Sequence, residues 1–332
     1  MTRFWKWLSV SGLFIVGILI SVGIFRAYLR GANDFFVFYQ AWKWVLLGQG
    51  DQIYRVSPDR FLYSPGFAWL LSPFALLSRN LALAIWCLIK VFFIGLIIKK
   101  FSEPWQSQNT LLAFGISAWG VVLVARPLLI DFEYGQVNII ILGVCVWGIL
   151  GHFEKKNSFF WDPFRWLLLT TAAVAKLYPL PLLLVPWAIQ FGISKKKLKF
   201  EKYAIFLGIL ISILIPVFSQ GWAGTWSLFL DWREAIMARG LPLESHNQSF
   251  SALIYHYLSG NPTAVLSEGG PILLGQRCLS AVQISFLSLF WTSGVIGIIL
   301  GWIVAGSNHS PFKWTAMMIG LLIVPSHLVW KP

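Results

Sequence analysis

Long apolar runs recur along the chain, several of them long enough for a helix to cross the roughly 30 Å hydrocarbon layer of a bilayer. The runs are Trp7–Phe25, Leu81–Ile98, Leu111–Ile130, Val137–Phe153, Tyr203–Phe218, Leu279–Ala305 and the start of a last one at Trp314–Val324. They are longer than barrel strands, and a bilayer core offers no water to hydrogen-bond an open backbone. The pattern therefore predicts an all-α, polytopic membrane protein.

Two further apolar stretches are interrupted by prolines. Tyr63–Leu77 is short and contains Pro65 and Pro73, so we expect a helix that lies in the outer interface rather than a crossing. Phe160–Phe191 also contains prolines and is barely long enough to cross twice, which predicts a hairpin whose tip, Ala175–Pro179, stops below the outer surface. With this hairpin the chain is expected to have about nine spans.

Charged residues make up 12% of the 332 residues, and the formal net charge is +13. In a membrane protein such an excess marks the cytoplasmic side and does not indicate nucleic acid. Arg3 and Lys6 place the N-terminus in the cytoplasm. Lysine clusters return to that side at Lys99–Lys100, Lys155–Lys156 and Lys195–Lys197.

This division leaves two long loops outside, at about residues 26–80 and 219–276, which we expect to carry interfacial helices. The chain is expected to form one membrane domain over residues 1–332, with further C-terminal helices after Pro332.

A carboxylate, Asp34, follows the first span in the stretch GANDFFVFYQ at Gly31–Gln40. One interpretation is an N-cap for a helix that begins at Phe35, because aspartate is favoured there. The other is a general base, held at a fixed depth and able to accept a proton from an attacking hydroxyl. The two roles are compatible, and both remain open.

Four more charged residues are candidates for substrate contacts. Asp131 and Glu133 are predicted in a short outer turn, Asp131–Gln136, where they would bind acceptor hydroxyls or cap the next helix. Lys176 stands among prolines at intramembrane depth, where a charge is costly and usually functional. It would bind a headgroup phosphate together with Arg126, or else extend to the interface as a snorkelling lysine.

Asn247 and Ser249, in the stretch SHNQS, offer neutral groups for sugar hydroxyls or for capping a helix. The three cysteines and five histidines show no ligand-like spacing. The sequence therefore predicts neither a metal site nor a cofactor.

Five motifs carry a resemblance to a known family. In chain order they are DFFVFYQAWKWVLLGQGDQIY, FLYSPGFAWLLSPFALL, GQVN, AVAKLYPLPLLL and NQS, spread over about residues 30–255. Each is weak alone, but their order and distances resemble glycosyltransferase family 87, a group of polyprenyl-phosphate-mannose-type transferases of the GT-C superfamily. The resemblance implies a GT-C-type helical bundle.

The resemblance also implies roles for particular residues. Asp34 matches the first-loop aspartate regarded as the catalytic base, and Lys176 matches the lysine of a hairpin near the donor phosphate. The substrate-binding positions matched by motif are Gln136 and Asn138 in the GQxN turn, and Asn247 and Ser249 in the later Asn-x-Ser. Family members also carry a late Trp-x-His-His motif. Here Trp330 is followed by Lys331 and Pro332, so either His327 takes the place of these histidines or the sequence lacks them.

These inferences predict an inverting glycosyltransferase of the cell inner or plasma membrane. It would move a hexose, expected to be mannose, from a polyprenyl-phosphate donor to a hydroxyl of a glycan or lipid acceptor on the non-cytoplasmic side. Its other partners would be membrane lipids. The alternative is a lipid-linked-sugar flippase or transporter, because an intramembrane lysine and broken helices also suit a translocation path.

Overall fold

We describe the protein from a computed structural model that covers residues 3–55, 61–103, 110–152, 161–176, 179–184, 200–239, 272–274, 277–279 and 290. The helices are α1 (Arg3–Arg30), α2 (Asn33–Leu46), α3 (Pro65–Leu71), α4 (Arg79–Ser102), α5 (Thr110–Leu123), α6 (Ala125–Tyr134), α7 (Asn138–His152), α8 (Trp161–Lys176), α10 (Phe200–Leu214) and α11 (Val217–Arg239). Short 3-10 turns are η1 (Gly50–Gln52), η2 (Ser72–Leu76) and η4 (Leu180–Leu184).

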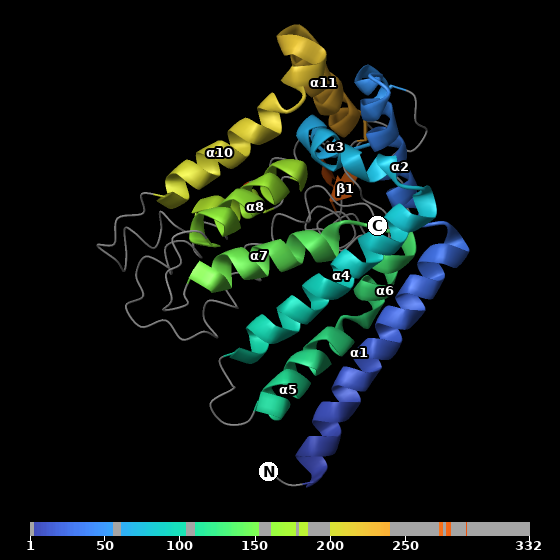
Figure 1. Ribbon diagram of the computed structural model, residues 1–332, viewed down its shortest axis with the longest axis vertical. Coiled ribbons are helices and arrows are strands. Elements are labelled where there is room, and N and C mark those ends of the chain that lie inside the picture. The colour runs from blue at the N-terminus through green and yellow to red at the C-terminus, as the bar shows by residue number, and fades with distance from the viewer. Residues whose placement is uncertain are drawn as a thin grey trace.

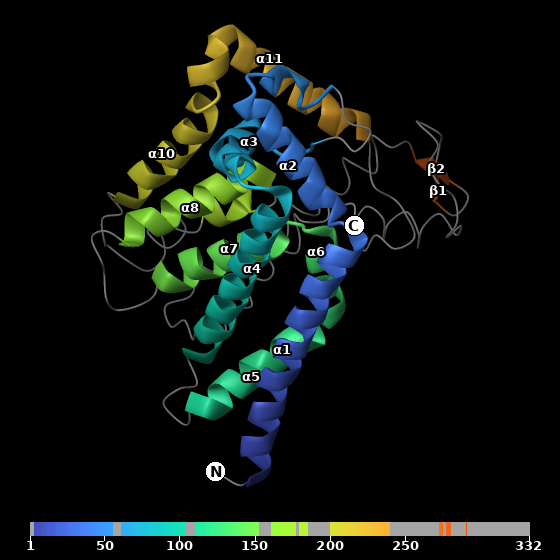
Figure 2. The ribbon, with the colours of Figure 1, turned by 45° about the vertical axis from the view of Figure 1, so that its right-hand side comes forward.

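The described part is thus helical, as predicted, apart from one small hairpin. Strands β1 (Ile272–Leu274) and β2 (Arg277–Leu279) pair antiparallel, with Leu273 opposite Cys278 (Figure 2). The prediction of an all-α chain therefore missed this hairpin, which is only three residues long on each side.

Two helices, α1 and α4, are each long and apolar enough to cross a membrane. They correspond to the predicted runs Trp7–Phe25 and Leu81–Ile98. Their large apolar side chains remain exposed along the outer face, for example Phe14 on α1 and Phe92 on α4. A lipid environment accounts for such exposure, which would be unfavourable in water.

Two bent helix pairs raise the number of candidate spans among the described residues to as many as four. The pair α5–α6 bends by 68°, and the pair of Tyr203–Leu214 and Val217–Ile236 bends by 84°. The predicted span Leu111–Ile130 is therefore interrupted by a sharp bend between α5 and α6. Pro127 explains the first break, because its ring cannot fit against the carbonyl four residues earlier, and Pro216 lies in the second.

The remaining predicted spans are only partly described. Helix α7 lies within Val137–Phe153, and α8 ends at Lys176, inside the predicted tip Ala175–Pro179, while the hairpin itself remains a prediction. Leu279–Ala305 and Trp314–Val324 lie outside the described residues, so about nine spans remains a prediction.

The helices stand side by side in the order α1, α5, α4, α7, α8 and α10, with α2, α3 and α11 gathered at one end (Figure 1). The hydroxyl of Tyr28, near the end of α1, donates to the carbonyl of Asn80, at the start of α4. Helices α1 and α4 are therefore antiparallel. Helix α1 begins at the opposite end of the bundle and α4 ends toward it (Figure 1), so the basic pairs in the first turn of α1 and the last turn of α4 belong to that end.

An aromatic cluster anchors this upper end. It joins α2, residues 61–74 and α4, and comprises Phe35, Phe38, Trp42, Phe61, Tyr63, Phe67, Phe74 and Trp86. Helix α3, predicted to lie in the outer interface, is largely buried against α2, α8 and α10. Burying many aromatic rings together supplies most of the packing energy here and fixes α2 on α4.

Candidate active site

Helix α2 begins directly after a reversal of the backbone. Gly31 and Ala32 both have positive φ, at 79° and 46°, and the helix starts at Asn33. The side chain of Arg79 holds this reversal: its Nη2 donates to the carbonyl of Gly31 at 2.7 Å, and its guanidinium lies over the ring of Phe36.

Asp34 is half-buried in the first turn of α2. The expectation that it is the N-cap is wrong, since Ala32 occupies the cap position and Asp34 follows within the helix. A carboxylate in the first helical turn is nevertheless stabilised by the helix dipole. Its position leaves the catalytic interpretation open.

The predicted turn Asp131–Gln136 is shorter than expected, because α6 extends to Tyr134. The actual turn consists of Gly135 to Val137. Gly135 ends α6 in the left-handed conformation, with φ 70°, and its amide donates to the carbonyl of Phe132. On the other side the indole of Trp86 donates to the Gly135 carbonyl at 3.0 Å.

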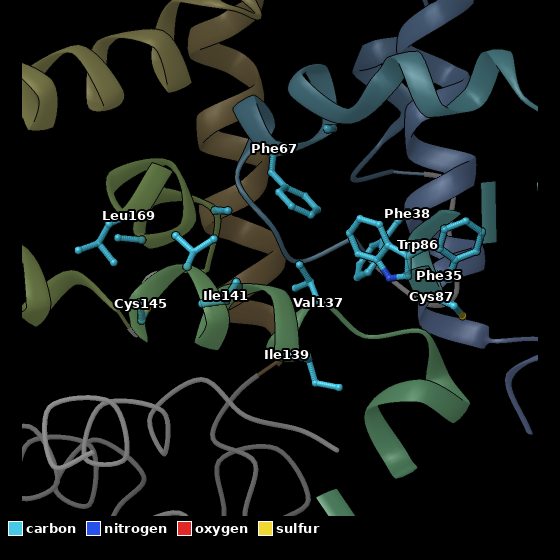
Figure 3. Close-up of a cluster of buried hydrophobic side chains, with 14 of the residues drawn as sticks. Phe35, Phe38, Phe67, Trp86, Cys87, Val137, Ile139, Ile141, Cys145 and Leu169 are labelled. Carbon is cyan, nitrogen blue, oxygen red and sulfur yellow. The ribbon is translucent and has the colours of Figure 1, made fainter. Parts of the chain in front are cut away.

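This turn packs directly against the start of α2. A Cβ on Gly135 would lie 2.5 Å from Cβ of Phe35 and 3.1 Å from Cβ of Ala32. The absence of a side chain at Gly135 therefore lets the turn approach the residues that flank Asp34. Figure 3 shows Phe35, Phe38 and Trp86 on one side of Val137, with Cys145 and Leu169 on the other.

Lys176 reaches the same turn from the end of α8. Its ammonium donates to Oδ1 of Asn138 at 2.5 Å, and Nδ2 of Asn138 donates to Oε1 of Gln136 at 2.7 Å. The ammonium also lies 5.4 Å from the ring centroid of Tyr63. The GQxN turn and the hairpin lysine, 38 residues apart, are thus in direct contact.

Tyr63 connects Lys176 to the helix of Asp34. Its ring meets that of Phe38 edge-on, with centroids 4.9 Å apart, while its carbonyl accepts a 2.7 Å hydrogen bond from the hydroxyl of Tyr54. Burial, with a smaller contribution from Asp231, raises the pKa of Tyr54 well above its usual value. Tyr54 therefore stays protonated and keeps donating this hydrogen bond at any physiological pH.

Asp131 is almost fully buried and pairs with Lys90 from the middle of α4. Its Oδ1 lies 2.7 Å from Nζ of Lys90, which also donates to the Asp131 backbone carbonyl at 2.7 Å. The other carboxylate oxygen accepts from the backbone amide of Asn138 at 3.1 Å. Asp131 therefore caps α7, one of its two predicted roles.

Glu133 faces α1 instead. One carboxylate oxygen lies 3.5 Å from Arg26, and the other accepts a hydrogen bond from Arg30. The carboxylate is buried while both arginines are substantially exposed. This contact ties the end of α6 to the end of α1.

Arg126 does not join this group. It is exposed in the first turn of α6, and the contacts of the described residues do not connect it to Lys176. Asn247, Ser249 and His327 lie outside the described residues. Within the described ranges, no three His, Cys, Asp or Glu side chains gather as a metal site.

Sequence reasoning passed over Lys90 and Tyr63. Lys90 did carry a signal, because a lysine in the middle of a membrane span needs a buried partner. The sequence offered several carboxylates and no means of choosing Asp131. Tyr63 carried no signal beyond its place in a conspicuously aromatic stretch.

The site lies below the end of the bundle. At about 1.5 Å per residue, Trp86 and Lys90 are about 10 Å and about 16 Å along α4 from Arg79. The turn that contacts Trp86 and Lys176 is therefore set back from the Arg79 end of α4.

Comparison with known proteins identifies the family. Residues 61–329, most of the chain, match glycosyltransferase family 87. The match includes the GQVN turn and Lys176, whereas Asp34 precedes it. Searches of curated proteins and of solved structures found no match. The chain therefore belongs to glycosyltransferase family 87 and is an integral-membrane transferase that acts on a sugar donor and an acceptor.

Proposed function

We propose that the protein transfers a hexose, most simply mannose, from a polyprenyl-phosphate donor to an acceptor hydroxyl on the non-cytoplasmic side, with inversion. One observation carries the proposal. The turn Gly135–Asn138 contacts both the start of α2, beside Asp34, and the ammonium of Lys176. A candidate base and a candidate phosphate ligand thus lie on either side of one turn.

In this proposal Asp34 takes the proton of the acceptor hydroxyl as its oxygen attacks the anomeric carbon. The bond between that carbon and the phosphate oxygen breaks, and the electron pair leaves with the lipid phosphate. Lys176 stabilises the negative charge of this leaving group. Attack opposite to a departing phosphate inverts the anomeric centre, and no protonation of the leaving group is needed.

The depth of Lys176 supports a lipid-borne donor. A nucleotide sugar carries all its charges in water, whereas a polyprenyl phosphate places its phosphate at the membrane surface with the chain in the apolar layer. The remaining predicted contacts complete the proposed site. Gln136, Asn138, Asn247, Ser249 and His327 would bind sugar or acceptor.

The donor class can be tested with purified protein in lipid vesicles. Labelled polyprenyl-phosphate mannose, polyprenyl-phosphate glucose and GDP-mannose are supplied in turn, with the organism's lipid and glycan extract as acceptors. We expect a labelled glycosidic product from a polyprenyl-phosphate donor only. Product formed from GDP-mannose alone would contradict the proposal. The transporter alternative is not favoured by membership in a transferase family.

Lys176→Met is expected to raise the KM for the donor by about 10- to 100-fold, with a smaller change in kcat. A hydrogen bond to a charged group contributes about 1.5–3 kcal/mol, which corresponds to this range. Initial rates across a series of donor concentrations measure the change. Lys43→Met, which removes an exposed lysine from α2, serves as the control. An unchanged donor KM would leave Lys176 as a snorkelling lysine.

Sidedness can be tested with single cysteines at the two ends of the bundle. Gln49 is exposed near the Asp34 end, and Lys6 is exposed at the opposite end of α1. In intact cells Gln49→Cys should react with a membrane-impermeant maleimide, while Lys6→Cys should react only after lysis. The native Cys87 and Cys145 are buried and should contribute little background, and Cys278 is replaced by serine in both variants. The opposite labelling pattern would invert the proposed topology.

A further inference from the structure

Lys90 places an amine in the interior of the helical bundle. Its side chain is fully buried at the middle of α4, and the carboxylate of Asp131 beside it is 5% exposed. Its ammonium also lies 5.1 Å from the ring centroid of Phe132. No substrate contact is needed to satisfy Lys90, so its role lies in what it holds in place.

From Lys90 a continuous series of contacts leads to Lys176. Lys90 holds one oxygen of Asp131, and the other oxygen of Asp131 holds the backbone amide of Asn138. The side chain of Asn138 then accepts the hydrogen bond of Lys176. Because Lys176 has only donors, this bond requires the oxygen of the Asn138 amide, and the remaining amide nitrogen donates to Gln136.

A buried ion pair of this kind contributes little net stabilisation to the folded protein. Removing two charges from water costs about as much as their attraction returns, and apolar residues of similar size often serve equally well. The best-established use of such pairs is to select one structure among alternatives. Here the pair selects the position of the first residue of α7, which is Asn138.

We propose that Lys90 and Asp131 are positioning residues for sugar transfer: through Asn138 they set where the ammonium of Lys176 meets the donor phosphate. This inference rests on the proposed role of Lys176 at that phosphate. It assigns to Asp131 a role that needs no contact with sugar. It also assigns Lys90 a place in the site, with Asp131, Asn138 and Lys176 standing between it and the donor.

The test is a double-mutant cycle read in the donor KM. The first variant joins Lys90→Met with Asp131→Leu, so that no charge is left buried alone. The second is Lys176→Met, and the third joins all three substitutions. Each protein is assayed with polyprenyl-phosphate mannose, and its folding is checked by gel-filtration profile. If the apolar pair does not accumulate in membranes, Lys90→Gln with Asp131→Asn replaces it.

The pair variant is expected to raise the donor KM about tenfold, a typical coupling for residues in one network of ion pairs and hydrogen bonds, with kcat less affected. In the Lys176→Met background the same pair should change the donor KM less than twofold, because its effect passes through Lys176.

An equal fold-change in both backgrounds, or an unchanged KM in the pair variant, would overturn this inference alone. If Lys176→Met itself leaves the donor KM unchanged, the proposed phosphate role fails and the inference fails with it.

Discussion

Replacing Asp34 with asparagine is expected to reduce kcat by about 10²- to 10⁴-fold, the usual contribution of a general base. Asparagine has nearly the same size but cannot accept the acceptor's proton. The donor KM should stay close to that of the unsubstituted protein, because Lys176, on a different helix, is expected to bind the donor phosphate. The loss therefore appears in kcat, measured with saturating polyprenyl-phosphate donor.

The control variant is Asn33→Ala, one residue earlier and exposed at the start of the same helix. It alters the first turn of α2 and leaves the carboxylate in place, so transfer should remain within a few-fold of the original rate. Asp34→Asn should also keep its folding, since losing a favourable charge at a helix N-terminus costs about 0.3–1 kcal/mol. If Asp34→Asn transfers sugar at the original rate, the general base is another residue. The family match begins at residue 61 and so does not include Asp34.

Gly135→Ala is expected to be the most destabilising single methyl addition in the described site. The residue has φ 70°, a conformation that costs a non-glycine residue about 1–2 kcal/mol. Its new Cβ would meet Cβ of Phe35 at 2.5 Å, which forces the backbone of α2 or of the turn to move. Overpacking of this kind adds about 1–3 kcal/mol. We expect a clearly lower midpoint of thermal unfolding in detergent and a loss of transfer activity.

The matched control is Gly120→Ala on α5, where an added Cβ meets no atom within 4 Å. Alanine there should leave the unfolding midpoint unchanged or raise it slightly, because glycine is the weaker helix former. Fluorescence-detected thermal melts of both variants in the same detergent make the comparison. Equal midpoints for the two variants would show that the Gly135 turn does not hold the start of α2.

Some elements of the fold could be predicted from residues that are close together in the sequence. The length of Trp7–Phe25 and Leu81–Ile98 was enough to predict α1 and α4, because helix length and bilayer thickness are linked by the rise per residue. The break within Leu111–Ile130 was also marked, by Pro127, but the continuous hydropathy of the run concealed it. The extension of α6 to Tyr134 was harder to predict from the sequence. Asp131 and Glu133 look like residues of an exposed turn when their buried partners are unknown.

The candidate site, too, could be predicted only in part from the sequence. The amino-acid sequence by itself determined the membrane character, the helical class, the two long spans and the family motifs, since each depends on residues close together in the chain.

Only the tertiary structure decided which distant residues meet: Lys90 with Asp131, Asn138 with Lys176, and Gly135 with Phe35. These pairings depend on how helices pack and on the left-handed turn at Gly135. The sequence shows that a buried charge needs a partner, but only the packing of the helices determines which residue that partner is.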